Sequence, residues 1–495
     1  MQVAFTGRTA VPAEHAPAAD PPGTAPSQPG GTPRSLVPAV TAALPVRLMP
    51  TPAPLPAPSR SVCPAGGHWP VGCITLAVRL VTGIKLSLRA TPRALAAVFE
   101  ALLGCPVSVM SGTTVRCWLM RLGLYALLRR LERATDWAYL IDHTVQIGPM
   151  KCFAVVGVRL GQLPYPARCL RREDLQLVAL VPMTHSTAAT VDQALEDAAL
   201  RTGVPRLIVS DEGGDVRVGI ERYSSRHAHT AATCDAAHKG ANLLRKLLEA
   251  DMSWPGFVAR LGQTKSKLQQ TPLASCIGPS LRPKARFMNL AAPLRWARWC
   301  LRVLDGPWPR GETLSERQRA VLATLDQRSV EEKLGWLRDY REAIERWCQW
   351  HEAIQVVVRH VRRCGIAEDS AEGLRREFEA MKLSVSGRDA ADAMVAFVAE
   401  QASACWPDGK RLIGSTEILE SIFGELKTLE RQQSESGMTG LMLAVGALTS
   451  AWSNEEIEKG LEATPWKAVE AWIDEHIGLT VQSQRAVARM LFAGP

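Results

Sequence analysis

The cysteines of this sequence form no pattern that would hold a zinc ion or a disulfide framework. There are 12 of them among 495 residues, with no C-x-x-C pair and no even, tight spacing. Structural zinc sites and small disulfide-rich folds both depend on such spacing. We therefore expect reduced thiols, as in cytosolic proteins. Two looser groups lack a second clustered pair and argue little for zinc: Cys63 with His68 and Cys73, and His227 with His229 and Cys234.

The sequence also lacks a secretory signal and a clear membrane span. Its first residues have neither a basic start nor an apolar run. The longest charge-free stretch of the folded part, residues 436–454, is diluted by three glycines and several Ser and Thr. A buried helix explains such a stretch better than a membrane helix. We expect a cytoplasmic protein with no membrane partner.

Residues 1–75 contain few large apolar side chains. Of the 33 prolines, 15 lie at or before Pro64, among Ala, Gly and Ser. Such a segment buries too little surface to offset its ordering entropy, so it is predicted to be a disordered arm. The net charge of +9 permits an anionic partner without demonstrating one.

Two amphipathic helices with a short turn between them are predicted for residues 80–134. The first has Thr91 as its expected N-cap and ends at Gly104. Its apolar face is expected to consist of Leu95, Val98, Phe99, Leu102 and Leu103. The second is expected to direct Arg116, Arg121, Arg129 and Arg130 outward. Helix, tight turn and basic helix is the outline of a DNA-binding helix-turn-helix, although other small helical bundles share it.

From Trp137 the hydrophobic pattern changes to that of strands. Three apolar runs separated by turn residues are followed by alternating helices and short strands as far as residue 252. This is the order of an α/β ribonuclease-H-like mixed sheet. Residues 253–410 read as an all-α insertion that splits this domain, and residues 411–495 as its last, helical part.

Two acids stand where two of these strands are expected to end. Asp142 follows WAYLI and Asp211 follows RLIVS. An unpaired carboxylate at the end of a buried strand is costly, so a structural role explains it poorly. Acids on neighbouring strands would share hard cations, and two Mg²⁺ or Mn²⁺ ions suit phosphodiester chemistry. Glu212 and Asp215 are weaker alternatives to Asp211.

A third carboxylate usually completes a two-metal site. Glu417 and Glu420 are the candidates, one turn apart on a predicted helix. His143 would point to the opposite face of its strand from Asp142 and is expected to be a core or supporting residue.

These residues together resemble DDE transposases with a ribonuclease-H-like catalytic domain. Asp142, Asp211 and a distant Glu within ILESIFGELK occur in the order typical of that group. Asp235-Ala-Ala-His238 matches the C/D-x-x-H motif of hAT-like and Mutator-like transposases. In those families the last Glu follows a helical insertion, for which there is room here. The stretch DHTVQIGPMKCFAVVGVRL is similar to bacterial insertion-sequence transposases.

The resemblance implies a role for each matching residue. Asp142, Asp211 and Glu420 would be the catalytic and metal-binding triad, with Glu420 preferred because it fits the E-S-x-F-x-x-x-K spacing. Asp235 and His238 would brace the site or approach DNA. The implied partners are the transposon ends and the target DNA, held by a homodimer or a higher oligomer. The implied location is the bacterial cytoplasm, at the nucleoid when DNA is bound.

Arginines interleave with tryptophans in the insertion, and such residues can grip phosphates and stack on unpaired bases. The group comprises Arg282, Lys284, Arg286, Arg295, Trp296, Arg298, Trp299 and Arg302. A helix with Trp in the core and Arg in solvent is the alternative for these residues. Arg116, Arg121, Arg295, Arg298 and Trp299 are the predicted DNA contacts.

We therefore expect a DNA transposase. Its helix-turn-helix would bind terminal inverted repeats, and its split catalytic domain would cleave the ends and transfer them to target DNA. Two alternatives stay open at this point: a non-catalytic DNA-binding protein, such as a regulator or decayed transposase, and another ribonuclease-H-like nuclease selective for DNA structure.

Overall fold

The computed structural model describes residues 63–64, 67–147, 150–163, 169–211, 213–281, 286–306, 315–406, 409–432, 439–478 and 481–492. Most of the predicted disordered arm therefore lies outside the described residues. So do Glu212, Arg282 and Lys284, and the side chain of Arg286. The fold begins earlier than predicted, because helix α1 starts at Val71 and buries Val71 and Ile74.

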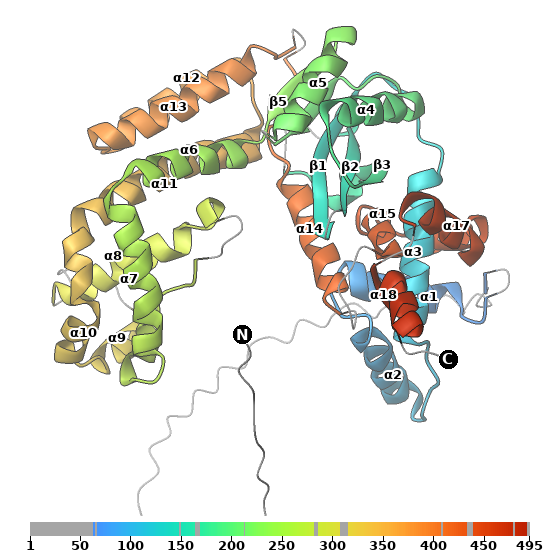
Figure 1. Ribbon diagram of the computed structural model, residues 1–495, viewed down its shortest axis with the longest axis horizontal. Coiled ribbons are helices and arrows are strands. Elements are labelled where there is room, and N and C mark those ends of the chain that lie inside the picture. Colours follow the sequence, from blue (N-terminus) through green and yellow to red (C-terminus); the bar gives the residue numbers. More distant parts are fainter. Residues whose placement is uncertain are drawn as a thin grey trace, which may run out of the picture. The chain divides into compact units, whose positions relative to one another are not determined.

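The described residues form a five-stranded mixed sheet, in the order β3-β2-β1-β4-β5 (Figure 1). Its strands are β1 (Trp137–Ile147), β2 (Met150–Arg159), β3 (Leu175–Met183), β4 (Leu207–Ser210) and β5 (Ala231–Cys234). The first three form an antiparallel meander, whereas β4 and β5 run parallel to β1. The strands predicted from the sequence are thus present, and the sheet is mixed.

The two faces of β1 face different cores because successive side chains of a strand point to opposite sides. Trp137, Tyr139 and Ile141 pack with helices α4 (Ala188–Thr202) and α5 (Gly214–Arg226). Leu140 packs instead with the N-terminal helices and with α14 (Glu417–Glu430). Asp142 has the same parity as Leu140, so β1 directs it toward the α14 side.

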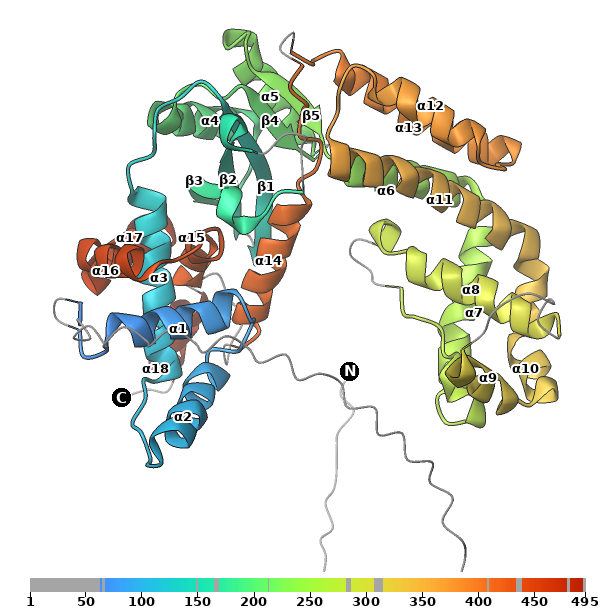
Figure 2. The same cartoon turned by 180° about the vertical axis from the view of Figure 1, so that it is seen from behind.

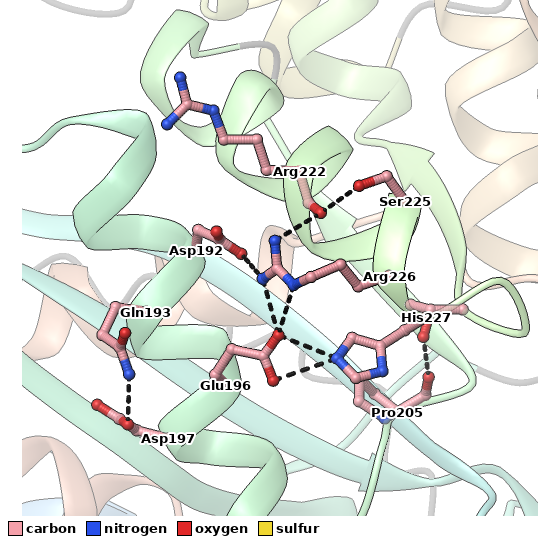
Figure 3. Close-up of polar contacts among 10 residues, drawn as sticks. Asp192, Gln193, Glu196, Asp197, Pro205, Arg222, Ser225, Arg226 and His227 are labelled. Carbon is pink, nitrogen blue, oxygen red and sulfur yellow. Dashed lines mark hydrogen bonds and ion pairs between the residues drawn. The ribbon is translucent and has the colours of Figure 1, made fainter.

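Charged side chains tie α4 to the end of α5 (Figure 3). Arg226 donates hydrogen bonds to Asp192 and Glu196, and the Nε2 atom of His227 lies 3.0 Å from Glu196. The hydrogen bonds of Arg226 and His227 hold the pKa of Glu196 below its usual value, although burial opposes the shift. His227 thus has a structural partner in α4.

The helix that was predicted to read DNA is instead a core helix. The N-terminal helices are α1 (Val71–Thr82), α2 (Ala90–Leu103) and α3 (Gly112–Leu128). Buried residues occur on more than one side of α3: Val115, Leu119 and Leu122 lie on one face, and Met120 and Leu124 lie on the opposite one. A helix-turn-helix must expose its second helix to the groove. The packing of α3 does not fit that role.

The predicted apolar face of α2 is only partly buried. Leu95 is 1% exposed, but Val98, Leu102 and Leu103 are 50%, 75% and 65% exposed. The helix starts one residue before Thr91, whose hydroxyl donates to the Ser87 carbonyl rather than capping the helix.

Glycine allows α3 to approach α15 (Ala444–Leu448) very closely. A Cβ atom on Gly123 would overlap the backbone carbonyl of Leu443. Replacing Gly123 by Ala should therefore lower the free energy of unfolding by about 3 kcal/mol, since backbone cannot easily move aside. Denaturant unfolding measures this. Gly262→Ala is the control, because nothing lies within 4 Å of its Cβ position and it should be neutral or stabilising.

The insertion predicted for residues 253–410 consists of helices and their connections in the described residues, with one isolated β-bridge from Ile366 to Leu412. Helix α6 (Ala236–Ala250) leads into the insertion. The insertion itself contains α7 (Ser253–Leu268), η3 (Pro272–Cys276), η4 (Arg286–Met288), α8 (Ala291–Leu304), α9 (Glu316–Ala323), α10 (Gln327–Leu334), η5 (Gly335–Tyr340), α11 (Arg341–Cys364), α12 (Ser370–Glu379) and α13 (Val385–Ala402). Figure 2 shows α6 alongside α11. Trp254, Phe257 and Trp347 form the aromatic centre of its core.

After α14 the chain returns to pack against α3. The remaining elements are η6 (Gly440–Leu443), α15, α16 (Asn454–Ala463), α17 (Trp466–His476) and α18 (Val481–Phe492). Two short 3-10 turns, η1 (Leu160–Gln162) and η2 (Arg172–Asp174), lie between β2 and β3. The described part of the charge-free stretch is buried, as expected, but forms a 3-10 turn and a short helix. Within the described ranges, no helix has the length and apolar character needed to cross a membrane.

Candidate active site

Asp142 and Asp211 are brought to the same edge of the sheet. Parallel pairing between β1 and β4 ends at Leu140 and Val209, two residues before each acid. β1 itself continues past Asp142, because Asp142 still pairs with Ala154 of β2. The prediction that β1 ends at Asp142 was therefore wrong. Only its pairing with β4 stops before Asp142.

The surroundings of Asp142 disfavour its charge. Burial, followed by the nearby charge of Asp211, raises the pKa of Asp142 from 3.8 to about 7, and Glu420 adds to the shift. A hydrogen bond from the backbone N–H of His143 to Oδ1, 2.6 Å long, and the charge of His238 act in the opposite direction. A cation at this position would relieve the repulsion among the three acids.

Asp235 joins the three segments that surround the site. Its N–H donates to the Ser210 carbonyl, next to Asp211. Its Oδ1 accepts a 2.8 Å hydrogen bond from the N–H of His238 and so caps α6. Its Oδ2 accepts hydrogen bonds from the N–H and hydroxyl of Thr416, at 2.6 and 3.1 Å. These hydrogen bonds outweigh burial and hold the pKa of Asp235 below its usual value.

His238 lies between Asp235 and Glu420. Its Nδ1 is 3.3 Å from Asp235 Oδ1, and its Nε2 is 3.5 Å from Glu420 Oε1. Burial opposes protonation of the ring, but the hydrogen bond and charge of Asp235 and the charge of Glu420 raise the pKa of His238 to about 9. His238 is therefore a cation at neutral pH, positioned against Glu420.

Helix α14 presents Glu420 to the site through its amphipathic pattern. Leu419, Ile422 and Leu426 are buried on the sheet side. The opposite stripe, spaced three or four residues apart, faces a cleft and consists of Glu417, Glu420, Gly424 and Lys427. Burial raises the pKa of Glu420, against the effect of His238.

The two candidate glutamates have different surroundings. Glu420 lies beside His238 and interacts electrostatically with Asp142. Glu417 forms an ion pair with Arg362 of α11, with Nε and Oε2 2.5 Å apart. The geometry therefore favours Glu420 as the third acid.

The cleft at this site has a volume of about 470 Å³ and is polar. Asp142, His238 and Glu420 line it from the sheet side and from α14. On the other side α11 contributes a row of polar residues that the sequence did not single out: His351, Gln355 and Arg362. Their spacing of four and seven residues, which puts them on one side of an amphipathic helix, was the signal available in the sequence.

The oxygen donors suit Mg²⁺ or Mn²⁺ in kind, since they are carboxylates from two strands and one helix. Among the side chains that the structure describes, however, no group of three His, Cys, Asp or Glu is arranged to hold a metal ion. The fit is therefore one of chemistry and charge, and not of ligand geometry.

The DNA contacts predicted from the sequence lie outside this cleft. Arg121 donates hydrogen bonds to the Leu461 and Thr464 carbonyls, and burial lowers its pKa. Arg298 forms ion pairs with Glu345 and Glu352. Arg116 and Trp299 are partly buried, whereas Arg295 is exposed.

The tryptophans of the insertion follow the alternative interpretation. Trp299 packs against the insertion core, and Trp296 donates its indole N–H to the Cys276 carbonyl. The ring of His143 packs at a tilt against Phe153, with ring centroids 5.4 Å apart, and its Nε2 lies 3.9 Å from Asp215.

No family model matches this sequence, and no curated protein matches it. A solved structure similar to the chain is the Drosophila P element transposase strand transfer complex. It is 11% identical, has a TM-score of 0.37, and the match covers 79% of this chain and 94% of that chain. Because the identity and the TM-score are low, the proposal that follows rests on the side chains of this chain alone.

Proposed function

We propose that this protein is a DNA transposase whose active site consists of Asp142, Asp211 and Glu420. The observation that carries the proposal is the electrostatic coupling of Asp142 on β1 to Asp211 at the end of β4 and to Glu420 on α14. Asp142 and Glu420 both line the polar cleft. Burial and repulsion by the neighbouring acids raise the pKa of Asp142 to about 7. Bound cations would stabilise the ionised acids, so this shift supports a cation-binding site.

The strand order supports a ribonuclease-H-like catalytic domain. An antiparallel meander of β1, β2 and β3 is followed by parallel β4 and β5, and α14 returns after the helical insertion. Asp235 and His238 begin the helix that leads into the insertion, as in the C/D-x-x-H motif. The proposed partners are transposon-end and target DNA, held by at least a dimer.

Each residue has a role that follows from its position. The three acids would hold two Mg²⁺ or Mn²⁺ ions, which activate the attacking water or 3′-hydroxyl and stabilise the leaving oxygen. His238 is a cation at neutral pH and fixes the orientation of Glu420. Asp235 holds His238 and the start of α14 in place. Lys427 supplies a positive charge on the Glu420 side of the cleft.

The test is cleavage of DNA carrying the terminal repeats that flank the gene. Wild-type protein should cleave these ends with Mg²⁺ or Mn²⁺ and not with EDTA. Glu420→Gln should lower the rate about 10²- to 10³-fold, because it removes a charge from the reacting centre. Glu430→Gln, on the same helix but outside the cleft, is the matched control and should cleave normally.

Other results would change the assignment. Loss of activity in Glu417→Gln but not in Glu420→Gln would make Glu417 the third acid. DNA binding without cleavage under any metal condition would favour a non-catalytic DNA-binding protein. Cleavage restricted to branched DNA would favour a structure-selective nuclease.

A further inference from the structure

The ion pair between Arg362 and Glu417 joins α11 to α14 in the lining of the cleft at the proposed active site. The two atoms concerned, Nε and Oε2, are 2.5 Å apart. The side chains are 39% and 48% exposed. Exposed ion pairs stabilise a fold little, because water and salt screen them. This pair can therefore open and exchange partners at small cost.

The pair lies where two cavities meet. Arg362 and Glu417 line the polar cleft that contains Asp142 and Glu420. Both also line a second cavity of about 360 Å³, whose other walls are largely apolar and include Leu170 and Ile418. The guanidinium of Arg362 thus lines the same cleft as Asp142 and Glu420. It is paired with Glu417, a carboxylate that is not one of the proposed metal ligands.

Arg362 also continues a row of polar side chains on α11. His351, Gln355 and Arg362 all line the cleft. Separations of four and seven residues place them on one side of the helix. Opposite them, α14 contributes Glu420 and Lys427. A nucleic-acid backbone in the cleft would have the metal-binding acids on one side and this row on the other.

We propose that Arg362 is a DNA phosphate-binding residue and that Glu417 occupies its guanidinium until DNA enters. The proposal rests on the proposed function, since it takes DNA as the ligand of the cleft. A guanidinium binds the oxygens of a phosphate at least as well as it binds those of a carboxylate, because its paired N–H donors fit both groups. Glu417 therefore competes with DNA, and its negative charge also repels the incoming phosphates.

Arg298, another arginine of the insertion, has more ion-pair partners than Arg362. Its guanidinium is held by two carboxylates, Glu345 and Glu352, and its side chain is 34% exposed. Arg362 has a single carboxylate partner among the ion pairs of the described residues, and it lines two cavities. Of these two arginines of the insertion, Arg362 is the one placed to change partner.

The experiment measures binding of a fluorescently labelled terminal-repeat duplex in EDTA over a series of salt concentrations, so that cleavage plays no part. Glu417→Gln should tighten binding about 3- to 10-fold, because it frees Arg362 and removes a repelling charge. Arg362→Gln should weaken binding by a similar factor and reduce the salt slope by about 1. The double variant should bind like Arg362→Gln alone.

Arg363→Gln is the matched control, because Arg363 is exposed on the same turn but lines neither cavity. It should change affinity much less than Arg362→Gln. If the two arginine variants are equally affected, or if Glu417→Gln weakens binding, the inference is wrong while the proposed function stands. If the wild-type protein does not bind DNA at all, both are wrong.

Discussion

Replacing Asp142 by Asn should lower DNA cleavage about 10³-fold or more and, at the same time, stabilise the metal-free protein above pH 7. The loss of activity follows from the position of Asp142 among the three acids at the sheet edge. The gain in stability follows from the same surroundings. Burial and the charges of Asp211 and Glu420 oppose the ionised form of Asp142, and Asn removes that charge.

The direction of the pH effect follows from the pKa in each state. The pKa of Asp142 is about 7 in the fold and near 3.8 in the unfolded chain. Between these values the folded state binds more protons, so the free energy of unfolding of the wild-type protein falls as pH rises. The full contribution is roughly 4 kcal/mol, present below pH 4 and lost above pH 7. Asp142→Asn should remove this slope.

Denaturant unfolding in EDTA at pH values from 4 to 8 measures the effect. Asp215→Asn is a useful contrast, because hydrogen bonding and the charges of His143 and Lys151 outweigh burial and hold the pKa of Asp215 below its usual value. That variant should lose stability at neutral pH. An Asp142→Asn protein that is less stable than wild type at pH 8 would contradict the interpretation. Mn²⁺ should raise the melting temperature of the wild-type protein more than that of Asp142→Asn.

Replacing Asp235 by Ala should destabilise the protein by about 3–5 kcal/mol and abolish cleavage. Asp235 is 1% exposed and accepts hydrogen bonds from His238 and Thr416. Removing it would leave a partly buried cationic histidine without its counter-charge, and the N–H groups of His238 and Thr416 without their acceptor. Such losses are among the costliest changes a fold can undergo. The first turn of α14, with Glu420, would lose its attachment to α6.

Two further variants separate the position of α14 from general damage. Thr416→Val removes one hydroxyl donor and keeps the backbone N–H, so it should cost about 1 kcal/mol and retain most activity. Asp235→Asn keeps an acceptor for the cap of α6 but weakens the pairing with His238, so it should lower kcat more than stability. Normal cleavage by a folded Asp235→Ala protein would contradict the positioning role.

The residues of the proposed site could be predicted from the sequence because chemistry and order are visible there. Acids next to apolar strands are costly without a function, and this distinguished Asp142 and Asp211. The helix of Glu420 was visible from its period, with Leu419, Ile422 and Leu426 on one side. The E-S-x-F-x-x-x-K spacing already favoured Glu420 over Glu417. The ion pair of Glu417 with Arg362, more than 50 residues away in sequence, could not be predicted.

The role of the arginines could not be predicted, because a charge in a sequence does not reveal what it pairs with. Arg121 and Arg298 satisfy carbonyls and carboxylates of distant elements. Likewise, the two-helix outline at residues 80–134 did not reveal that α3 is enclosed by α15, α16 and β3. Which side chains pair and which helices are enclosed depend on tertiary packing, and the hydrophobic period of a short segment does not predict that packing.

The hydrogen bond from Thr416 to Asp235 joins residues 181 positions apart, and this has a consequence for synthesis on the ribosome. At about 5–20 residues per second, Asp235 is made roughly 10 to 40 s before Thr416. During that time α14 has not been made, so the end of β4, strand β5 and helix α6 cannot yet form their contacts with it. The helices of the insertion, whose contacts are local, can fold first. We expect nascent chains that stop before α14 to be bound by chaperones and degraded readily by proteases.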